Sequence, residues 1–428
     1  MNRRRWLLAV LVAASIVAAA IASSARSVNA KAAKPCAFTL RIGDVLPFTG
    51  DLAAYGANLD RAVKLAVSLQ NASLKRLHLS SRIKVQLVAS EDGQSQATAS
   101  VEAATKLVKS NHVNVIIGEM ASSATIPMAQ SVTIPDHIVQ ISPTSSAPQI
   151  SSIADNGYLW RVYPSDTLQG KVLAQAALDA FGKGATVNVG ARNDAFGTAL
   201  KALFVNQFKA LGGKVGVNIS WNPDQANFDS EAQQLVGGNP AGWVIIDFPE
   251  TFQKFAPSLV RSGKWSASKT LMTEALRNAS VLDGIGSPVV GLRGTAASAA
   301  GGPAGAGFAA LWKAQVRGAK PYTGFEGTAF DAANVAFLAA LRGCSSSAPR
   351  LRKSLIPVSG PPGAKVTFKQ MDRAVKLLLA HKEIDYEGAF SPVDFDRNGD
   401  INSAVYEIWK YDGGGKIETL KTITFKGK

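Results

Sequence analysis

Residues 113 to 125 read VNVIIGEMASSAT, and this stretch decides the fold class. Its apolar residues form a run as long as one buried strand: Val113, Val115, Ile116 and Ile117. Gly118 ends the run, and two serines and a threonine follow before a segment that we expect to be helical. A short buried strand that leads through such a turn into a helix is typical of an α/β sheet with helices on its faces.

The same alternation of strands and helices extends in both directions from this stretch. Strands are predicted at 40–45, 82–88 and 137–142, with helical apolar faces at 59–69 and 97–108. Repetition of strand, helix and strand implies a parallel sheet that helices cover on both faces.

A second unit of the same kind begins near residue 166. Its predicted elements are helices at 166–181 and 195–211 and strands at 185–191, 214–219, 242–247 and 270–274. The segment 295–307, TAASAAGGPAGAG, is too rich in glycine and alanine for a packed element, so we expect a flexible connection there. After it, the predicted elements are helices at 308–316 and 331–341 and strands at 405–410 and 419–425. The length and this pattern predict two lobes.

Residues 1–30 have the three-part layout of a secretory signal peptide. Three arginines precede an apolar stretch from Trp6 to Ile21, and small residues lead to Ala30. The apolar stretch is shorter than the about 18 to 20 residues that a membrane span requires. We therefore expect export and cleavage after Ala30, and the consecutive arginines leave a twin-arginine route open.

The composition argues against several classes of function. The net charge is +15, but the charged residues are scattered rather than clustered with aromatics, so no nucleic-acid partner is predicted. The four histidines stand far apart in no metal-ligand spacing, so no metal site is predicted. DFDRNGDI at 394–401 begins like a calcium loop, but its twelfth position is Val405, and a tight turn is expected instead. The sequence has no G-x-S-x-G motif, and catalysis is not expected.

A second turn rich in hydroxyl groups follows the strand at 137–142. It reads ISPTSSAP at 141–148, so Ser122 and Ser123 of the first turn have counterparts in Thr144, Ser145 and Ser146. Ligands collect at the carboxyl ends of parallel strands, and free N–H groups at a helix start favour an anion. The alternative is ordinary N-capping, because serine and threonine cap helices in many proteins. Two such turns in one sheet favour a binding site for a small anionic group.

Seven stretches occur in an order that resembles a known family. They are IGDVLPFTGDLAAYG at 42–56, ED at 91–92, IIGEMASSAT at 116–125, ISPTSSAP at 141–148, YLWRVYPSD at 158–166, NDAFG at 193–197 and FSPVDFDRNGD at 390–400. This set is similar to the substrate-binding proteins of branched-chain amino acid ABC transporters, the type I periplasmic binding proteins typified by the leucine/isoleucine/valine-binding protein. The resemblance covers about residues 40 to 410.

The resemblance implies two Rossmann-like lobes with parallel sheets flanked by helices, joined by three hinge crossovers. We expect 38–160 and 290–392 to form the first lobe, and 161–289 and 393–428 to form the second. It also implies a periplasmic or extracellular monomer, without catalysis or cofactor, that captures an amino acid, branched-chain or similar, in the cleft by hinge closure. The implied partners are the permease and ATPase subunits of an ABC importer.

The resemblance assigns the polar contacts of the ligand. Ser122 would bind the ligand carboxylate, and the second turn would line the pocket through Thr144, Ser145 and Ser146. Glu274 in LMTEALRN would meet the ligand ammonium, since an unpaired buried charge costs roughly 3 to 5 kcal/mol. A solvated loop acid is the alternative for Glu274.

The resemblance also assigns the apolar part of the pocket. Tyr55 would close the near wall, and Phe196 and Phe325 would contact the ligand side chain. Phe196 stands where the family commonly has tyrosine, so one polar contact is in doubt. Phe248, with the preceding Asp247, is expected to face the cleft.

Two other functions stay open at this point. The same fold could serve a ligand-sensing protein that reports an amide, urea or an aromatic acid to a signalling partner. An exported α/β enzyme is the second alternative, although no motif places a nucleophile beside a base.

The two cysteines, Cys36 and Cys344, suggest one disulfide, because an even pair in an exported chain is commonly bonded. If 331–341 is a helix of the first lobe with its amino end toward the cleft, Cys344 after it and Cys36 before the first strand lie at the same rim. Two unpaired thiols are the alternative.

Overall fold

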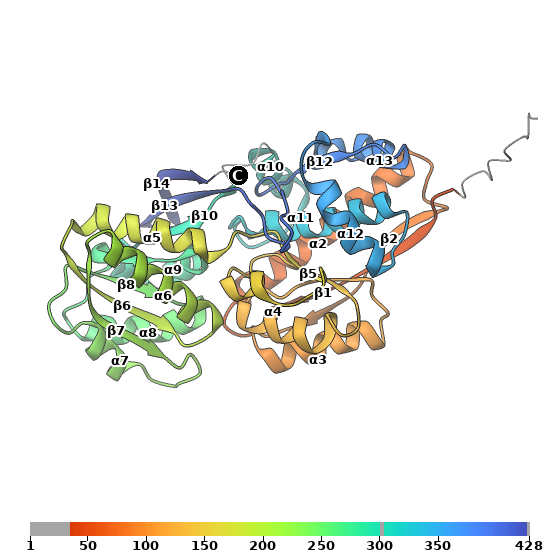
Figure 1. Cartoon of the computed structure of the whole chain (residues 1–428). Coiled ribbons are helices and arrows are strands. Elements are labelled where there is room, and N and C mark those ends of the chain that lie inside the picture. Colours follow the sequence, from red (N-terminus) through yellow and green to blue (C-terminus); the bar gives the residue numbers. More distant parts are fainter. Residues whose placement is uncertain (1–34, 300–303, 426–428) are drawn as a thin grey trace, which may run out of the picture. The chain divides into compact units, whose positions relative to one another are not determined.

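Two sheets form the framework of the protein (Figure 1). The computed structural model describes residues 35–299 and 304–425, so the predicted signal peptide at 1–30 lies outside the described residues. No helix within these ranges is both long enough and apolar enough to cross a membrane.

The first sheet is parallel throughout and has the strand order β2-β1-β3-β4-β5. Its strands are β1 (Phe38–Leu46), β2 (Ile83–Asp92), β3 (Val115–Gly118), β4 (Val139–Ser142) and β5 (Leu159–Arg161). All four residues of β3 and of β4 are buried, as the apolar run at 113–117 predicted.

The second sheet has the strand order β14-β13-β10-β9-β8-β6-β7. Its strands are β6 (Thr186–Arg192), β7 (Lys214–Trp221), β8 (Gly242–Ile246), β9 (Thr270–Met272), β10 (Arg293–Ala297), β13 (Ala404–Gly413) and β14 (Lys416–Phe425). The sheet is parallel from β7 to β10, whereas β13 and β14 are antiparallel additions. The expected α/β class is confirmed, with this antiparallel edge as the departure from a parallel sheet.

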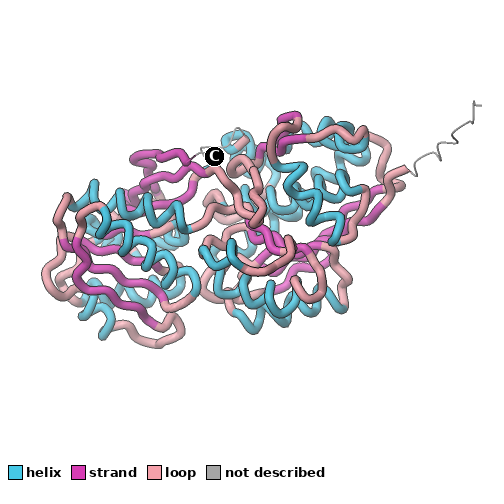
Figure 2. Tube along the Cα trace, in the orientation of Figure 1, coloured by secondary structure: helices cyan, strands magenta, loops and turns pink. Residues whose placement is uncertain are grey.

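Helices cover the faces of both sheets (Figure 2). They are α2 (Ala53–Arg76), α3 (Ala97–Lys109), α4 (Ser122–Met128), α5 (Asp166–Phe181), α6 (Ala195–Ala210), α7 (Asp229–Leu235), α8 (Pro249–Arg261), α9 (Ala279–Ile285), α10 (Gly305–Gln315), α11 (Phe325–Gly343), α12 (Ala348–Ser359) and α13 (Met371–Leu379). A short parallel pair, β11 (Ala364–Thr367) and β12 (Ile384–Glu387), lies among the last helices.

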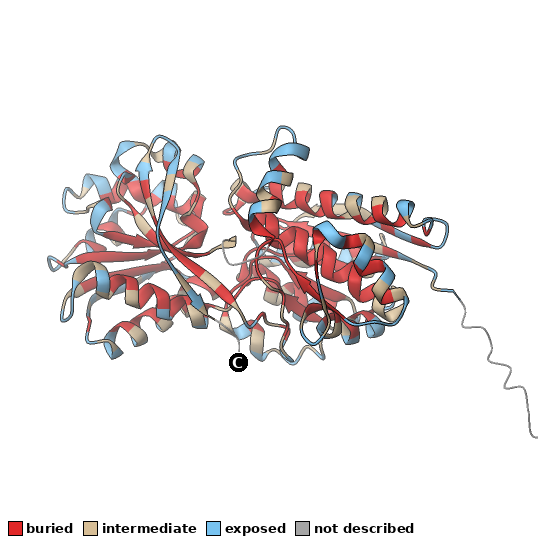
Figure 3. Ribbon diagram, turned by 90° about the horizontal axis from the view of Figure 1, so that it is seen from above, coloured by how far each residue is buried: buried red, intermediate tan, exposed pale blue. Residues whose placement is uncertain are grey.

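Helix α11 is the most deeply buried helical element. Every residue from Phe325 to Leu341 is buried, and the helix packs against α2, α12 and α13. Figure 3 shows that buried residues occupy most of the strands and the helix faces that contact them. Helix α11 is buried on all sides, its polar residues Glu326, Asp331 and Asn334 included, so other elements enclose it. Its alanine-rich sequence allows the close approach of its neighbours.

The chain passes between the two sheets three times. It leaves the first sheet after β5 and enters the second sheet at β6. After β10 it returns to α11, which contacts β1 and β3 of the first sheet, and it re-enters the second sheet at β13. This connectivity agrees with the three expected crossovers. The lobe limits themselves stay a prediction, apart from the strand discussed next.

The expected flexible connection at 295–307 is wrong at both ends, because residues 295–297 belong to β10 and residues 305–307 belong to α10, while residues 300–303 lie outside the described residues. β10 (Arg293–Ala297) is a strand of the second sheet, paired with β9 and β13, and it includes residues that we assigned to the first lobe from position 290. Small residues are needed here for packing, because a Cβ on Gly294 would lie 2.4 Å from Cζ2 of Trp409. Gly294 therefore lies in a crowded strand and not in a loose linker.

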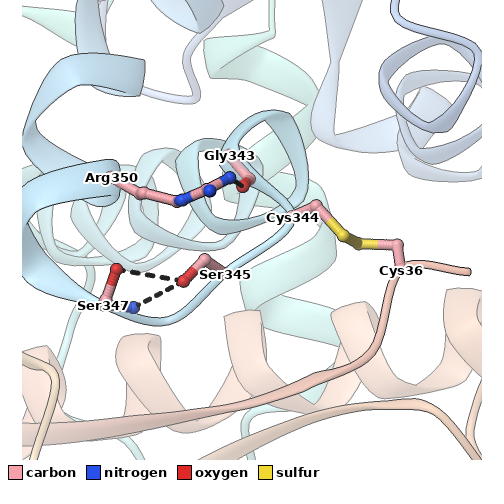
Figure 4. Close-up of a disulfide and its surroundings, with 6 residues drawn as sticks. All are labelled: Cys36, Gly343, Cys344, Ser345, Ser347 and Arg350. Atoms are coloured by element: carbon pink, nitrogen blue, oxygen red, sulfur yellow. Dashed lines mark hydrogen bonds between the residues drawn. A yellow bond between two sulfur atoms is a disulfide. The ribbon is translucent and has the colours of Figure 1, made fainter. Parts of the chain in front are cut away.

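Cys36 and Cys344 form a disulfide (Figure 4). Cys36 lies two residues before β1, and Cys344 caps the carboxyl end of α11 in a left-handed conformation with φ 46°. The two Cα atoms are 5.4 Å apart, within the usual range of disulfides. The bond joins residues 308 positions apart in sequence.

Candidate functional site

The two hydroxyl-rich turns lie side by side at the carboxyl ends of β3 and β4, which are neighbours in the first sheet. The first turn leads into α4, which begins at Ser122. The second leads into a 3₁₀ turn at Pro148–Ser152 and not into the expected α-helix.

A small cavity opens beside these turns and is lined by elements of both sheets. Its lining residues are Leu52, Met120, Ser122, Thr144, Ser146, Phe196, Phe248, Glu274, Ala275 and Phe325. Seven of the nine residues predicted to bind ligand are among them. The cavity volume is about 20 Å³, room for about one water molecule. A larger ligand therefore requires the walls to separate before it enters.

Ser122 joins the two turns and keeps one donor for the cavity. Its Oγ accepts hydrogen bonds from the backbone N–H groups of Ser146 and Ala147, each at 3.2 Å. A hydroxyl has two acceptor sites and one donor. Both acceptor sites are used here, and no acceptor for the hydroxyl hydrogen lies within hydrogen-bond distance among the described residues. The O–H of Ser122 is thus available to a ligand oxygen.

The hydroxyl groups of Thr144 and Ser146 offer acceptors to the cavity, whereas that of Ser122 offers a donor. The hydroxyl of Thr144 donates to the carbonyl oxygen of Met120 at 2.9 Å, and that of Ser146 donates to Oδ2 of Asp166 at 3.1 Å. Their hydrogens are used within the protein, so each hydroxyl presents acceptor lone pairs to the cavity. We had expected these hydroxyls to donate to an anion.

Two predicted ligand-binding residues lie behind the cavity wall. Ser145 Oγ is 2.7 Å from Thr125 Oγ1 and also bonds the backbone carbonyls of Glu119 and Met120, so it braces the two turns. Tyr55 donates its hydroxyl to the carbonyl oxygen of Ala275 at 2.8 Å and packs edge-on against Phe325 at 5.2 Å. Tyr55 thereby supports two lining residues from the side away from the cavity.

Glu274 is the acidic group of the cavity. It follows β9 and is 5% exposed, and the side-chain amide of Gln169 donates to its Oε2. Burial raises the pKa of Glu274 to about 7, although its own backbone N–H and Gln169 stabilise the ionised form. The lining contains no lysine, arginine or histidine within the described part of the chain, so no cation of the protein neutralises this carboxylate at the cavity.

A second acid, Asp166, lies behind Glu274. It is fully buried at the start of α5, and its Oδ1 has no hydrogen-bond partner among the described residues. Burial, followed by the charge of Glu274, raises the pKa of Asp166 well above its usual range. The hydroxyl of Tyr163 and Oε1 of Gln169 are also buried without partners in the described residues. The region around Glu274 is therefore rich in buried oxygen atoms without partners.

The rest of the cavity wall is apolar. The ring centres of Phe196 and Phe248 are 5.2 Å apart, with an angle of 17° between the two rings. Phe325, the first residue of α11, also lines the cavity. Leu52, Met120 and Ala275 complete the apolar surface. Sequence analysis missed these three, although each is within a few residues of a predicted position.

Asp166 and Gln169 were also missed as parts of the site. Asp166 belongs to the YLWRVYPSD stretch, and Gln169 follows it by one helical turn, a spacing that would place both on one face of α5. Among the described residues, no group of three or more histidine, cysteine, aspartate or glutamate side chains is arranged to hold a metal ion.

Comparisons with known proteins agree with this architecture. The sequence pattern of a family described as periplasmic binding protein matches residues 39–416. The substrate-binding protein BasB of a chemotactic signal transduction system in Halobacterium salinarum is 23% identical over 359 residues, 82% of each chain.

Two solved structures share the fold at low identity. The leucine-binding protein LivK of Thermotoga maritima has a TM-score of 0.72 and 19% identity, covering 90% of this chain and 98% of its own. A solute-binding protein of an ABC transporter from Rhodopseudomonas palustris, in complex with 3,4-dihydroxybenzoic acid, has a TM-score of 0.68 and 18% identity, covering 91% and 98%.

Proposed function

Because this chain belongs to the periplasmic binding protein family, whose members bind solutes and are not enzymes, we propose that it captures an amino acid in the cavity. The family places it outside the cytoplasmic membrane. In this proposal an ABC permease with its ATPase subunits receives the ligand from the closed protein, which acts as a monomer.

The observation that carries the proposal is the buried, unneutralised Glu274. A carboxylate that is removed from water needs a partner of opposite charge, and the cavity lining offers none. A ligand ammonium would supply that charge, and the acceptor lone pairs of Thr144 and Ser146 would take up its remaining hydrogens.

The ligand carboxylate, which is bonded to the same carbon as the ammonium, would lie beside Ser122. The free O–H of Ser122 is one donor. The first backbone bonds of α4 are donated by Ala124 and Thr125 to the carbonyl of Ala121, which leaves the N–H groups of Ser122 and Ser123 ahead of them. The apolar wall that the phenylalanines form suits an aliphatic or aromatic side chain.

Capture would proceed by closure of the walls around the ligand. The cavity holds about one water as it stands, and its lining comes from elements of both sheets. The ligand would favour the closed form by contacting Ser122 from one side and Glu274 from the other.

A thermal-shift screen of residues 31–428 tests this function. The decisive ligands are L-leucine, 4-methylpentanoate, which is leucine without its ammonium, and 3-methylbutylamine, which is leucine without its carboxylate. Free ligand at one hundred times its dissociation constant adds about 2.7 kcal/mol to the free energy of unfolding. We expect an amino acid to stabilise the protein and both truncated analogues to fail, with Glu274→Gln abolishing the effect.

An aromatic acid is the second candidate, because three phenylalanines line the cavity and one related structure holds a dihydroxybenzoic acid. Protonated Glu274 could donate a hydrogen bond to its carboxylate, since burial raises the pKa of Glu274 to about 7. A role in sensing rather than import would follow the likeness to the chemotactic relative. Stabilisation by benzoate or 3,4-dihydroxybenzoate, with no response to any amino acid, would overturn the first proposal in favour of this one.

A further inference from the structure

A cluster of charged residues beside the cavity joins elements of the two sheets. Arg192 is the last residue of β6, and Asp51 lies between β1 and α2. Nη2 of Arg192 is 2.5 Å from Oδ2 of Asp51. Asp51 is followed directly by Leu52, which lines the cavity.

The same guanidinium contacts two more carboxylates, both from elements of the second sheet. Nε of Arg192 is 2.6 Å from Oδ2 of Asp194, and Nη1 is 3.7 Å from Oδ1 of Asp247. Arg192 is 2% exposed and Asp247 is fully buried. Three acids therefore surround one cation, and only Asp51 reaches it from the first sheet.

Arg192 also supports the aromatic wall of the cavity. Its Cζ atom lies 3.8 Å from the centre of the Phe248 ring, in a cation–π arrangement. Phe248 stacks in turn on Phe196, and both rings line the cavity. The guanidinium thus packs on one face of the Phe248 ring and can hold the ring in place when a ligand contacts it.

We infer that Arg192 is a positioning residue for the ligand pocket, and that its ion pair with Asp51 forms on closure and slows ligand release. The inference rests on the proposed capture of a solute by closing walls. Asp194 and Asp247 stay with Arg192 whether or not the walls are apart, because all three belong to the second sheet and its loops. Asp51 pairs with Arg192 only when the ends of β1 and β6 approach, so this contact adds to the closed form alone.

Formation of the Arg192–Asp51 ion pair couples closure of the walls to the shape of the pocket. When Asp51 engages one edge of the guanidinium, the planar group is held by three carboxylates and rests over Phe248. Lysine would keep the charge but not the planar group that stacks on the ring. A second contact, from the N–H of Glu250 to the carbonyl oxygen of Asp51 at 3.4 Å, involves the backbone and survives a change of the Asp51 side chain.

Two matched variants separate this role from simple loss of a buried charge. Asp51→Asn removes the charge that crosses between the sheets and keeps the size of the side chain. Asp194→Asn removes a carboxylate that pairs with the same guanidinium but belongs, like Arg192, to the second sheet and its loops. Asparagine can still cap α6, because its side-chain oxygen can accept from the N–H of Gly197, as that of Asp194 does at 2.8 Å. Arg192→Lys is the third variant.

The first measurement is the dissociation rate of L-leucine by stopped flow. We expect Asp51→Asn to raise it about tenfold or more with little change in the association rate, and Asp194→Asn to raise it less, because Asp194 contacts Arg192 in the open and the closed form alike. Arg192→Lys should fall between Asp51→Asn and the wild type. Equal rates in Asp51→Asn and the wild type, or equal increases in both aspartate variants, would overturn the inference.

The second measurement needs no ligand. Small-angle X-ray scattering of the unliganded proteins should give a larger radius of gyration for Asp51→Asn than for the wild type, and an unchanged radius for Asp194→Asn. An unchanged radius for Asp51→Asn contradicts the inference. If leucine fails to bind the wild type, the proposed ligand falls, while the contrast between the two variants in scattering still decides whether Asp51 holds the walls together.

Discussion

The N–H of Ser146 donates to Oγ of Ser122 at 3.2 Å, which ties the turn after β4 to the turn after β3. Ala147 donates to the same oxygen at 3.2 Å. The two turns are therefore one connected unit, and Ser122 both holds them together and keeps its hydrogen for a ligand.

Ser122→Ala is expected to weaken the binding of an amino acid by about 10-fold to 100-fold. The reason is the loss of a hydrogen bond to a charged carboxylate, about 1.5–3 kcal/mol, together with two N–H groups left without their acceptor. Isothermal titration calorimetry with the ligand found in the thermal-shift screen measures the change. Ser123→Ala is the matched control, since Ser123 has the same chemistry one residue later and does not line the cavity. Equal effects of the two variants would remove Ser122 from the site.

The affinity for an amino acid is expected to rise with pH. Burial raises the pKa of Glu274 to about 7 in the free protein, and an ammonium binds the ionised carboxylate. Below pH 7 most of the protein carries protonated Glu274, so the dissociation constant at pH 6 should exceed that at pH 8 by about tenfold. An aromatic acid that accepts a hydrogen bond from protonated Glu274 would show the opposite slope.

Titrations between pH 5.5 and 8.5 distinguish these cases. Glu274→Gln serves as the control, because it removes the ionisable group: no binding of an amino acid is expected at any of these pH values, and an aromatic acid should give a flat profile. A slope that persists in Glu274→Gln would assign the titration to another group, and Asp166 is the neighbour to change next.

Gly294→Ala is expected to destabilise the protein by about 1–3 kcal/mol through overpacking of the second sheet. Its Cβ would meet Trp409 at 2.4 Å and the carbonyl oxygen of Met272 at 2.8 Å. Gly284→Ala in the exposed helix α9 is the control, since the nearest atom there is 3.8 Å away and alanine favours a helix by about 0.5–1 kcal/mol. Urea unfolding measures both variants. Equal stability of Gly294→Ala and the wild type would mean that β10 has more room than the structure gives it.

Much of the fold was predictable because strands and helices alternate with clear apolar periods. The run at 113–117 became β3, and 166–181 became α5 at the residues expected. β10 was missed because its small residues look like a linker until Trp409, more than one hundred residues later, is known to cover Gly294. Packing between distant segments of this kind leaves no local pattern in a sequence.

Most residues that line the cavity were predictable, but which of their hydroxyl groups donate to a ligand and which accept was not. The family resemblance assigned Ser122, Glu274 and the phenylalanines to one pocket, and in the structure they line one cavity. Whether a hydroxyl donates or accepts depends on what its other side meets. Thr144 and Ser145 differ by one position, yet one lines the cavity and the other bonds Thr125 behind it. No spacing rule distinguishes these two.

The disulfide is expected to stabilise the protein without affecting the ligand. Loss of a bond between residues 308 positions apart should cost about 2–5 kcal/mol, because the reduced unfolded chain is less constrained. Phe325 and Cys344 lie at opposite ends of the 19-residue helix α11, about 28 Å apart at 1.5 Å per residue, so ligand affinity should stay within about twofold.

The variants Cys36→Ala, Cys344→Ala and the double variant test this in urea unfolding. If the bond is the source of the stability, each single variant loses as much as the double variant, since either change removes the same bond. Additive losses would instead mean that the two side chains act separately through packing. Peptide maps of the wild-type protein with and without reductant give the direct control, and free Cys36 and Cys344 in both maps would contradict the bond itself.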